Sequence, residues 1–408
     1  MDAQEQINFR VKVGTVFRPC APVDRITLFA GRQDQINDVV NATVQPGRHV
    51  IMFGERGVGK TSLAKVLAEI LSGAGLQLLN SGTINCDGTD NFASLWRKIF
   101  REMTVIMRAK QIGFRSESFD ETRSLDSLLP EEPTPDDIRY ILSQIPGTVI
   151  IILDEVDRIK DRETITLLAD TIKNLSDHSV NVTLILVGVA DAVDDLISEH
   201  RSIERALIQV PMPRMSRAEL LQIIDRGLSH AGMTIDEHAK DRIARLSQGL
   251  PHYTHLLGLY AALHAIDKNQ NTHITMSDVK AATITAVEKA HSILNAYYKA
   301  TSSPQKHNLY EEVLLACALA ETDDLGYFSA AAVAKPLSAI MDKPYYIPSF
   351  SRHLTDFCSG KRGPILQKTG KARRFRFRFI NPLMQPFVII HGLAKQLLDD
   401  ELLWIATR

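Results

Sequence analysis

The pattern of apolar and polar positions divides the chain into three parts. Up to residue 213, short apolar runs alternate with segments of helical spacing. Such runs are typical of strands buried on both faces of a parallel sheet. We therefore predict an α/β domain with a doubly wound parallel sheet over residues 25–213. The prolines near the start predict irregular chain over residues 1–30, of which residues 1–24 form an N-terminal extension.

The predicted strands of this domain are rich in β-branched residues. They cover residues 50–53, 76–86, 149–153, 181–188 and 208–210. Helical spacing predicts helices over residues 33–43 and 92–108, and another after the glycine-rich turn that follows the first strand. Residues 111–137 are polar, acidic and proline-bearing, which favours a surface insertion or mobile loop over an interaction arm.

From residue 216 onward the apolar spacing becomes helical. Ser216 and Glu219 form a capping box at the start of one helix, and further helices are predicted over residues 237–247 and 252–265 and from Thr275. We expect a small helical domain over residues 214–300.

Residues 305–408 follow a third pattern. It predicts a helix, a short strand near Tyr327, two more helices and two final strands, which is the order of a winged helix. These elements are expected at residues 309–320, 329–341, 349–357, 365–368 and 373–379. In the last strand Phe375, Phe377 and Phe379 alternate with arginines, so one face is expected in a core and the other in solvent.

The composition is that of a soluble globular protein, with 45% apolar and 23% charged residues among 408. This length predicts two or three domains. The formal charge of −1 excludes a general attraction to nucleic acid or acidic membranes, so such binding needs a local patch. Four scattered cysteines, with neither a secretory signal pattern nor an apolar run of bilayer length, favour a cytoplasmic protein that contacts no membrane.

The stretch after the first predicted strand has the spacing of a P-loop. Glycines let the backbone curl so that successive N–H groups face phosphate oxygens, and the following helix adds the positive end of its dipole. Lys60 is expected to reach the β and γ phosphates of ATP, and Thr61 to hold Mg²⁺ through its hydroxyl. The predicted nucleotide-binding residues are Gly54, Glu55, Arg56, Gly57, Val58, Gly59, Lys60, Thr61 and Ser62.

Two carboxylates, Asp154 and Glu155, follow the apolar strand predicted over residues 149–153. The carboxyl end of a central strand is where ligands bind in open α/β sheets. With a P-loop upstream, Asp154 is expected to hold the Mg²⁺ shell. Glu155 is expected to orient and deprotonate the water that attacks the γ-phosphate.

With these motifs the chain resembles the AAA+ and STAND branch of P-loop ATPases, and within it the origin-recognition-like ATPases. The resemblance covers about residues 20–265 and implies an ATPase domain, a helical lid over residues 214–300 and a C-terminal winged helix over residues 305–408. It is carried, besides the P-loop, by Leu28-Phe29-Ala30-Gly31-Arg32, Ile84-Asn85-Cys86, Asp154-Glu155, Gly188-Val189-Ala190-Asp191, Arg205 and Gly249-Leu250-Pro251.

Three positions gain roles only through this resemblance. Asp191 falls at the sensor 1 site, where the family usually has Asn, and its carboxylate would repel the γ-phosphate unless protonated or paired, which implies slow hydrolysis. Arg205 matches the arginine finger that a neighbouring subunit contributes, which implies a homo-oligomer. Arg201 is the second candidate, and a surface salt bridge is the alternative for Arg205. Pro251 matches an element placed against adenine in slow switch ATPases, and a helix-initiating turn is its alternative.

The C-terminal region also carries a basic stripe. Between Lys361 and Arg378 there are eight basic residues and no acidic one. Such a stripe suits phosphate contacts along duplex DNA, although a solvated edge strand or a surface for an acidic protein would look the same. The candidate DNA-binding residues are Arg352, Lys371, Arg373, Arg374, Arg376 and Arg378. The sequence thus leaves two functions open: an ATP-dependent DNA-associated factor, or a signalling switch that ADP holds closed and ATP opens to a protein effector.

Overall fold

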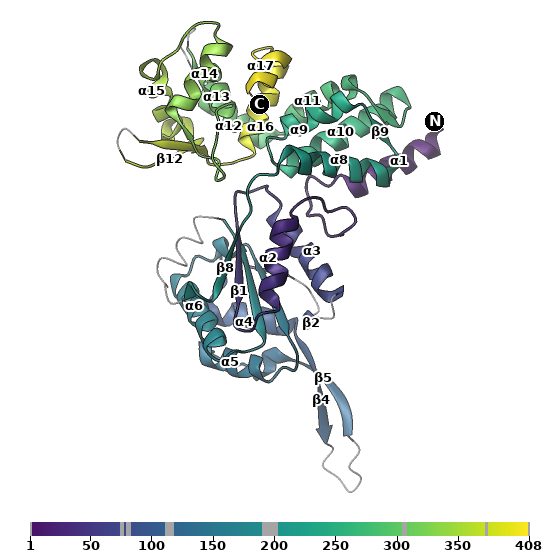
Figure 1. Cartoon of the computed structure of the whole chain (residues 1–408), viewed down its shortest axis with the longest axis vertical. Coiled ribbons are helices and arrows are strands. Elements are labelled where there is room, and N and C mark those ends of the chain that lie inside the picture. The colour runs from purple at the N-terminus through teal and green to yellow at the C-terminus, as the bar shows by residue number, and fades with distance from the viewer. Residues whose placement is uncertain are drawn as a thin grey trace. The chain divides into compact units, whose positions relative to one another are not determined.

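The computed structural model describes residues 2–73, 77–78, 83–110, 118–189, 203–303, 308–371 and 374–406 (Figure 1). The chain divides into two compact units. The sheet unit consists of Val23–Gly54 and Lys60–Met212, and the helical unit consists of Met1–Pro22, Glu55–Gly59 and Pro213–Arg408.

The sheet unit is built on a parallel sheet, as predicted. Its strands lie in the order β2-β6-β7-β1-β8, with β3 also pairing with β6, and every pair is parallel. The carboxyl ends of β1 and β6 therefore meet at the same edge, with β7 between them. The strands are β1 His49–Phe53, β2 Gln77–Leu78, β3 Ile84–Asn85, β6 Val149–Asp154, β7 Val182–Gly188 and β8 Leu207–Pro211.

Helices cover this sheet in two groups. Helices α4 Phe92–Arg101, α5 Pro135–Ser143 and α6 Arg162–Asp177 share one apolar cluster with β6 and β7, in which Trp96 is fully buried. Helices α2 Gln33–Thr43 and α3 Lys60–Gly73 contact each other and the strands of the sheet. All six residues of β6 are buried, which explains why this strand is continuously apolar.

A β-hairpin projects from the sheet unit, where the sequence predicted the end of a helix and an irregular insertion (Figure 1). Strands β4 Thr104–Lys110 and β5 Ser118–Ser124 pair antiparallel, from Thr104 opposite Ser124 to Lys110 opposite Ser118. The prediction of a helix to residue 108 is therefore wrong. Helix α4 ends because the β-branched and apolar run from Thr104 to Met107 suits a strand better than a helix.

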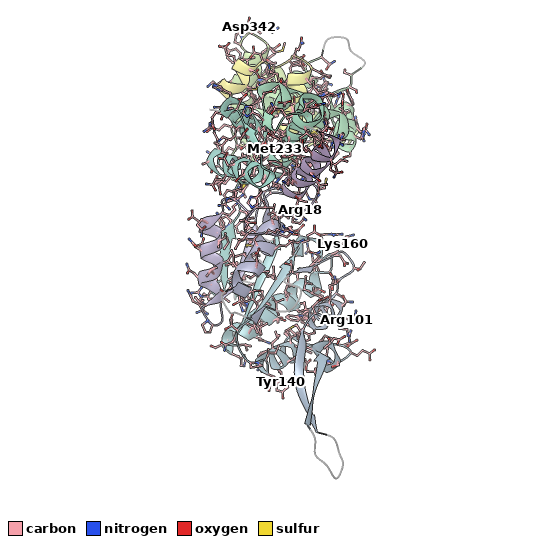
Figure 2. All side chains as sticks on the ribbon, turned by 90° about the vertical axis from the view of Figure 1, so that its right-hand side faces the viewer. Arg18, Arg101, Tyr140, Lys160, Met233 and Asp342 are labelled. Carbon is pink, nitrogen blue, oxygen red and sulfur yellow. The ribbon has the colours of Figure 1, made fainter. Side chains whose placement is uncertain are left out.

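The rest of the predicted insertion is also partly regular. The 3-10 helix η1 Leu125–Leu128 follows the hairpin, and Thr134 then caps helix α5 through a capping box with Asp137. Arg101 at the end of α4 and Tyr140 on α5, which is 60% exposed, lie on the surface of this unit (Figure 2). The acidic segment therefore contributes regular elements to the sheet unit as well as loop.

The helical unit begins with a helix that the sequence analysis described as irregular chain. Helix α1 Ala3–Val16 starts at a capping box in which the Glu5 N–H donates to Asp2 at 2.7 Å. It packs against helices α8 Arg217–Ala231 and α10 Pro251–Asn269. The helix escaped prediction because Ile7 and Val11 are exposed, so its apolar residues form no continuous stripe.

The remaining helices of the predicted lid follow in the expected order. Ser216 and Glu219 form the predicted capping box of α8, and α9 Glu237–Leu246 and α11 Met276–Lys289 lie where they were expected. Helix α12 His291–Thr301 was not predicted. Two short parallel strands, β9 Thr234–Ile235 and β10 His273–Ile274, join the loops of this region.

The C-terminal region has the predicted order of helix, strand, two helices and two strands. Its three-stranded antiparallel sheet has the order β11-β13-β12, and Phe377 and Phe379 on β13 are buried. Its elements are α13 Tyr310–Ala318, β11 Phe328–Ser329, α14 Ala330–Ile340, α15 Ile347–Phe357, β12 Leu366–Thr369, β13 Arg376–Phe379, α16 Met384–Ala394 and α17 Asp400–Ala406.

Helices α16 and α17 were not predicted. Every residue of α16 from Met384 to Gly392 is buried, so the helix has no solvent-facing polar side and shows no helical period in the sequence. Among the described residues, no helix is both long enough and apolar enough to cross a membrane.

Candidate nucleotide-binding site

The predicted P-loop is the turn between β1 and α3. Strand β1 ends at Phe53 and α3 begins at Lys60. Gly57 and Gly59 have φ angles of +90° and +95°, a region that residues with a side chain seldom adopt. The turn therefore depends on these two glycines, and it delivers the chain to the N-terminus of a helix, where backbone N–H groups bind anions.

Lys60 reaches back over this turn. Its Nζ donates to the carbonyl oxygen of Gly54 at 2.9 Å. The ammonium group thus lies over the mouth of the turn, where the sequence placed a phosphate ligand.

Asp154 and Thr61 come together in the sheet unit. Asp154 ends β6 and is 2% exposed, and Thr61 is in the first turn of α3. The Thr61 hydroxyl hydrogen-bonds the Asp154 carboxylate, and the Glu155 N–H donates to Asp154 Oδ1 at 2.8 Å. Burial raises the pKa of Asp154, while the hydrogen bonds from Thr61 and Glu155 and the charge of Lys60 lower it.

The second oxygen of Asp154 suits a metal ion. Oδ2 is buried and accepts no hydrogen bond from the described part of the chain. A buried carboxylate oxygen without a partner is costly unless a cation or a donor completes it. Together with the Thr61 hydroxyl it offers the hard oxygen ligands that Mg²⁺ prefers, so these residues fit the predicted metal site.

Glu155 has an unusual backbone conformation. Its φ of 57° and ψ of 38° are left-handed, and the chain turns there into the 3-10 helix η2 Val156–Arg158. Non-glycine residues in this region cluster at functional sites. The Glu155 carboxylate is partly exposed and accepts from Arg158 Nη1 at 2.9 Å. The side chain is therefore accessible, with Arg158 as its present partner.

A polar cluster beside β6 was not predicted from the sequence. Lys98 on α4 contacts the carboxylates of Asp87 and Asp90 at 3.1 and 2.8 Å. The Cys86 N–H donates to the backbone oxygen of Asp154 at 2.8 Å, which ties the end of β3 to the end of β6. Hydrogen bonds from Thr89 and Lys98 hold the pKa of Asp87 well below its usual range. The turn-forming sequence from Asp87 to Asp90 was the available signal.

The predicted sensor and finger positions remain predictions. Asp191 and Arg201 lie outside the described residues. Arg205 is exposed in the sheet unit, and its backbone oxygen accepts from Arg48 Nη1 at 2.9 Å. Exposure is what an arginine finger needs, and it is equally what a surface arginine shows.

Two residues of the helical unit contact the P-loop turn. Pro251 begins α10, and its Cγ lies 3.7 Å from the position that a Cβ on Gly59 would take. The side chain of Glu55 is only 6% exposed and forms an ion pair with Arg214 at 2.6 Å. Glu55 is one of the predicted nucleotide-binding residues, and its carboxylate has a partner of its own in the structure.

The predicted DNA-binding residues fall into two groups. Arg352, Lys371 and Arg374 are exposed. Arg376 instead pairs with Asp323 at 2.9 Å, and Arg378 donates to Gln367 and stacks on Tyr327. Arg373 lies outside the described residues. Arg376 is nevertheless exposed, so the described part of the stripe is largely presented to solvent, although Arg376 and Arg378 already have partners.

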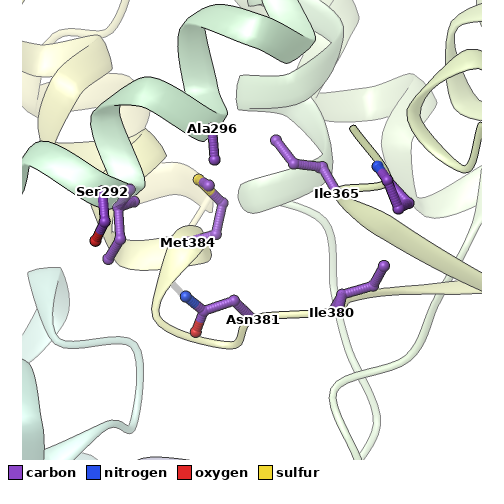
Figure 3. Close-up of a pocket in the computed structure, with 8 residues that line it drawn as sticks. Ser292, Ala296, Ile365, Ile380, Asn381 and Met384 are labelled. Carbon is purple, nitrogen blue, oxygen red and sulfur yellow. The ribbon is translucent and has the colours of Figure 1, made fainter. Parts of the chain in front are cut away.

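A cavity of about 200 Å³ lies within the helical unit (Figure 3). Its described lining contains no charged side chain and is mostly apolar. The lining residues are Ser292, Ile293, Ala296, Pro364, Ile365, Ile380, Asn381 and Met384. It therefore offers no charged group to phosphate or to a metal ion and differs in chemistry from the P-loop.

Residues 44–197 match the family model described as an AAA domain. This range contains the P-loop, Asp154 and Glu155, so the match supports the P-loop fold that the motifs predicted for this part of the chain. No curated protein shows a significant match to the chain.

Several solved structures resemble the whole chain. Cdc6p from Pyrobaculum aerophilum is 15% identical, with a TM-score of 0.48 over 95% of this chain and 99% of that one. The Aeropyrum pernix ORC1 protein in complex with DNA is 14% identical, with a TM-score of 0.47 over 94% and 97%. The Aeropyrum pernix ORC2 protein with ADPNP and ADP is 15% identical, with a TM-score of 0.49 over 96% and 97%. At these identities and scores the similarity assigns no activity or partner to this chain.

Proposed function

We propose that this protein is a Mg²⁺-dependent ATPase that binds ATP or ADP at the P-loop and hydrolyses ATP slowly. The observation that carries the proposal is the buried Oδ2 of Asp154, which lies beside the Thr61 hydroxyl and Lys60 and has no hydrogen-bond partner among the residues that the structure describes. Such a group is costly in the free protein and is completed by a hard cation bound with a nucleotide triphosphate.

Each residue then has a defined task. Lys60 exchanges the Gly54 carbonyl, its present partner at 2.9 Å, for the β and γ phosphate oxygens. Thr61 and Asp154 hold Mg²⁺, which neutralises charge on the phosphates when bound. Glu155 turns from Arg158 towards the attacking water and accepts its proton as general base.

The same proposal includes a homo-oligomer and slow turnover. Arg205 is exposed and would stabilise charge on the transferring phosphoryl group of a neighbouring subunit. Asp191 places a carboxylate where the family that the chain resembles usually has Asn, which disfavours fast hydrolysis.

For the C-terminal region we favour a winged helix that contacts duplex DNA, as in the origin-recognition-like ATPases. The order of its elements and the exposed Arg352, Lys371 and Arg374 support this assignment. The second candidate is a signalling switch whose winged helix binds a protein effector. It is favoured by the pairing of Arg376 with Asp323, which withdraws a cation from phosphate binding.

The variant Glu155→Gln tests the hydrolytic role. Loss of a general base typically lowers the rate by about 10²–10⁴-fold. We expect the variant to bind ATP as the wild type does, in an equilibrium titration, and to release almost no phosphate. Glu163→Gln on α6 is the matched control, since it removes the charge of an exposed carboxylate that has no role in the proposed mechanism. Phosphate release at the wild-type rate would remove Glu155 from the mechanism.

A further inference from the structure

Glu55 and Arg214 form a buried ion pair within the helical unit. Arg214 Nε donates to Glu55 Oε2 at 2.6 Å, and Nη2 reaches Oε1 at 3.3 Å. The two side chains are only 6% and 14% exposed. Two parallel bonds from one guanidinium to one carboxylate fix both direction and distance, which a single lysine contact would not.

Arg214 also hydrogen-bonds a residue of helix α16. Its Nη1 donates to Gln385 Oε1 at 2.6 Å and to the Gln248 carbonyl at 3.3 Å. Gln385 is 3% exposed, and its Nε2 donates to the carbonyl of Ala318 at the end of α13. A continuous chain of polar contacts thus runs from the P-loop turn to two C-terminal helices.

The surroundings are shaped to admit the Glu55 carboxylate. A Cβ on Gly326 would lie 1.9 Å from Glu55 Oε1, and the φ of +77° at this position also favours glycine. Beside it, Leu383 Cδ2 lies 3.1 Å from the position of a Cβ on Gly57. Tyr253 donates to the Leu383 carbonyl at 2.8 Å, which fixes the chain just before α16. Both sides of the turn are therefore in contact with the C-terminal region.

An ion pair buried to this degree is sensitive to the loss of either partner, because the remaining charge then has neither water nor a counterion. Glu55 is two residues before Gly57, within the turn that must fold around phosphates. We therefore expect a displacement of Arg214 or Gln385 to shift the turn. In the same way, a movement of the turn on phosphate binding should be transmitted to α16.

We propose that Arg214 and Gln385 are positioning residues for the phosphate-binding turn, and that the Glu55–Arg214–Gln385 chain couples nucleotide occupancy to helix α16. This inference rests on the proposed nucleotide binding. By thermodynamic linkage, if a bound nucleotide changes the conformation of α16, the conformation of α16 must also change the affinity for that nucleotide.

The test compares two substitutions at one position. Gln385→Met and Gln385→Glu both lose the donor to Ala318, but only Gln385→Glu keeps an acceptor for Arg214. In the full chain, we would measure release of a fluorescent ADP analogue and hydrogen exchange of peptides covering α16, with and without ADP. Gln222→Met, at an exposed position of α8, is the matched control.

We expect Gln385→Met to release ADP about tenfold faster than the wild type and to lose the ADP-dependent change in α16 exchange. Gln385→Glu and Gln222→Met should retain both properties. Arg214→Lys, which keeps the charge but loses the fork, should behave as Gln385→Met does. Circular dichroism would show whether each variant is folded. If Gln385→Met is unfolded, Arg214→Lys provides the test instead.

Unchanged ADP release and an unchanged α16 response in both Gln385→Met and Arg214→Lys would overturn the coupling while leaving the ATPase proposal intact. Failure of the wild-type protein to bind ADP would instead contradict the ATPase proposal, and the coupling with it. The two failures are distinguished by the wild-type titration alone.

Discussion

The guanidinium of Arg158 lies 2.9 Å from the carboxylate of Glu155, which stands at the end of β6 in a left-handed backbone conformation. The hydrogen bond raises the pKa of Arg158, so the cation persists at every working pH. In the proposed mechanism, Glu155 must therefore leave this partner before it can act on water. The pair is partly exposed, and its contribution to folding stability is small.

Replacing Arg158 tests whether this partner restrains Glu155. We expect Arg158→Ala to raise the rate of ATP hydrolysis about two- to fivefold without changing ATP affinity, because an exposed ion pair is a weak restraint. Single-turnover phosphate release would measure the rate, and Arg162→Ala at the start of α6 is the control. A lower rate in Arg158→Ala would show that Arg158 assists Glu155 instead of restraining it.

Lys60 is the residue on which the proposed nucleotide binding depends most. We expect Lys60→Ala to lose measurable ATP and ADP binding, because its ammonium is the cation that the turn presents to the phosphates. Isothermal titration checks this result. Lys65→Ala on the same helix keeps the helix and removes an equal charge, and it should bind as the wild type does. Retained ATP affinity in Lys60→Ala would refute the P-loop assignment.

The sequence predicted the parts of the site whose neighbours are close in the chain. The spacing of Gly54, Lys60 and Thr61 defines a local turn, and the apolar strand before Asp154 defines its own end. Sheet topology then brings Asp154 to Thr61, because β1 and β6 are parallel members of one sheet and end at the same edge. Local patterns therefore suffice where a regular element carries the residue to its place.

The Glu55–Arg214 pair could not be predicted in the same way. Neither residue belongs to a motif that specifies this pairing, and nothing in the spacing shows that the Glu55 side chain is buried. The β4–β5 hairpin was missed because seven residues per strand give too short a pattern to distinguish from the end of α4. The outward positions of Arg376 and Arg378 followed from alternation, but their partners Asp323 and Tyr327 did not.

The basic surface of the C-terminal region gives the next prediction. Lys371 and Arg374 are exposed, so we expect the double variant Lys371→Ala, Arg374→Ala to bind duplex DNA more weakly. The slope of log affinity against log salt should fall by about 0.9 for each phosphate that the variant no longer neutralises. Fluorescence anisotropy across a salt series, with and without ATP, measures both. Lys335→Ala on α14 is the control for charge alone.

Two results would redirect the assignment of this surface. A wild-type slope in the double variant would place DNA binding elsewhere on the protein. Absence of DNA binding by the wild type at low salt would leave the protein effector as the partner of the C-terminal region.

We expect the buried Asp154 carboxylate to lower the free energy of unfolding of the nucleotide-free protein. Burial raises the pKa of this carboxyl above its value in the unfolded chain, so the folded state holds the proton more tightly. The contribution of this carboxyl to the free energy of unfolding is therefore fully present at low pH. It falls as the pH rises through the pKa of the group in the unfolded chain and then through its pKa in the folded protein. In its ionised form, Asp154 is a buried charge whose Oδ2 lacks a donor among the described residues.

We expect Asp154→Asn to increase the free energy of unfolding at pH 7 in the absence of nucleotide, since a neutral amide is less costly to bury than a carboxylate. The difference from the wild type should shrink as the pH is lowered, because the wild-type carboxyl is then protonated. Mg²⁺ with ATP should stabilise the wild type and not the variant. Urea unfolding at several pH values measures these effects, with Asp170→Asn at an exposed position of α6 as control. A less stable Asp154→Asn protein at pH 7 would mean that the carboxylate is satisfied within the fold, and the buried Oδ2 would then give no reason to place a metal at Asp154.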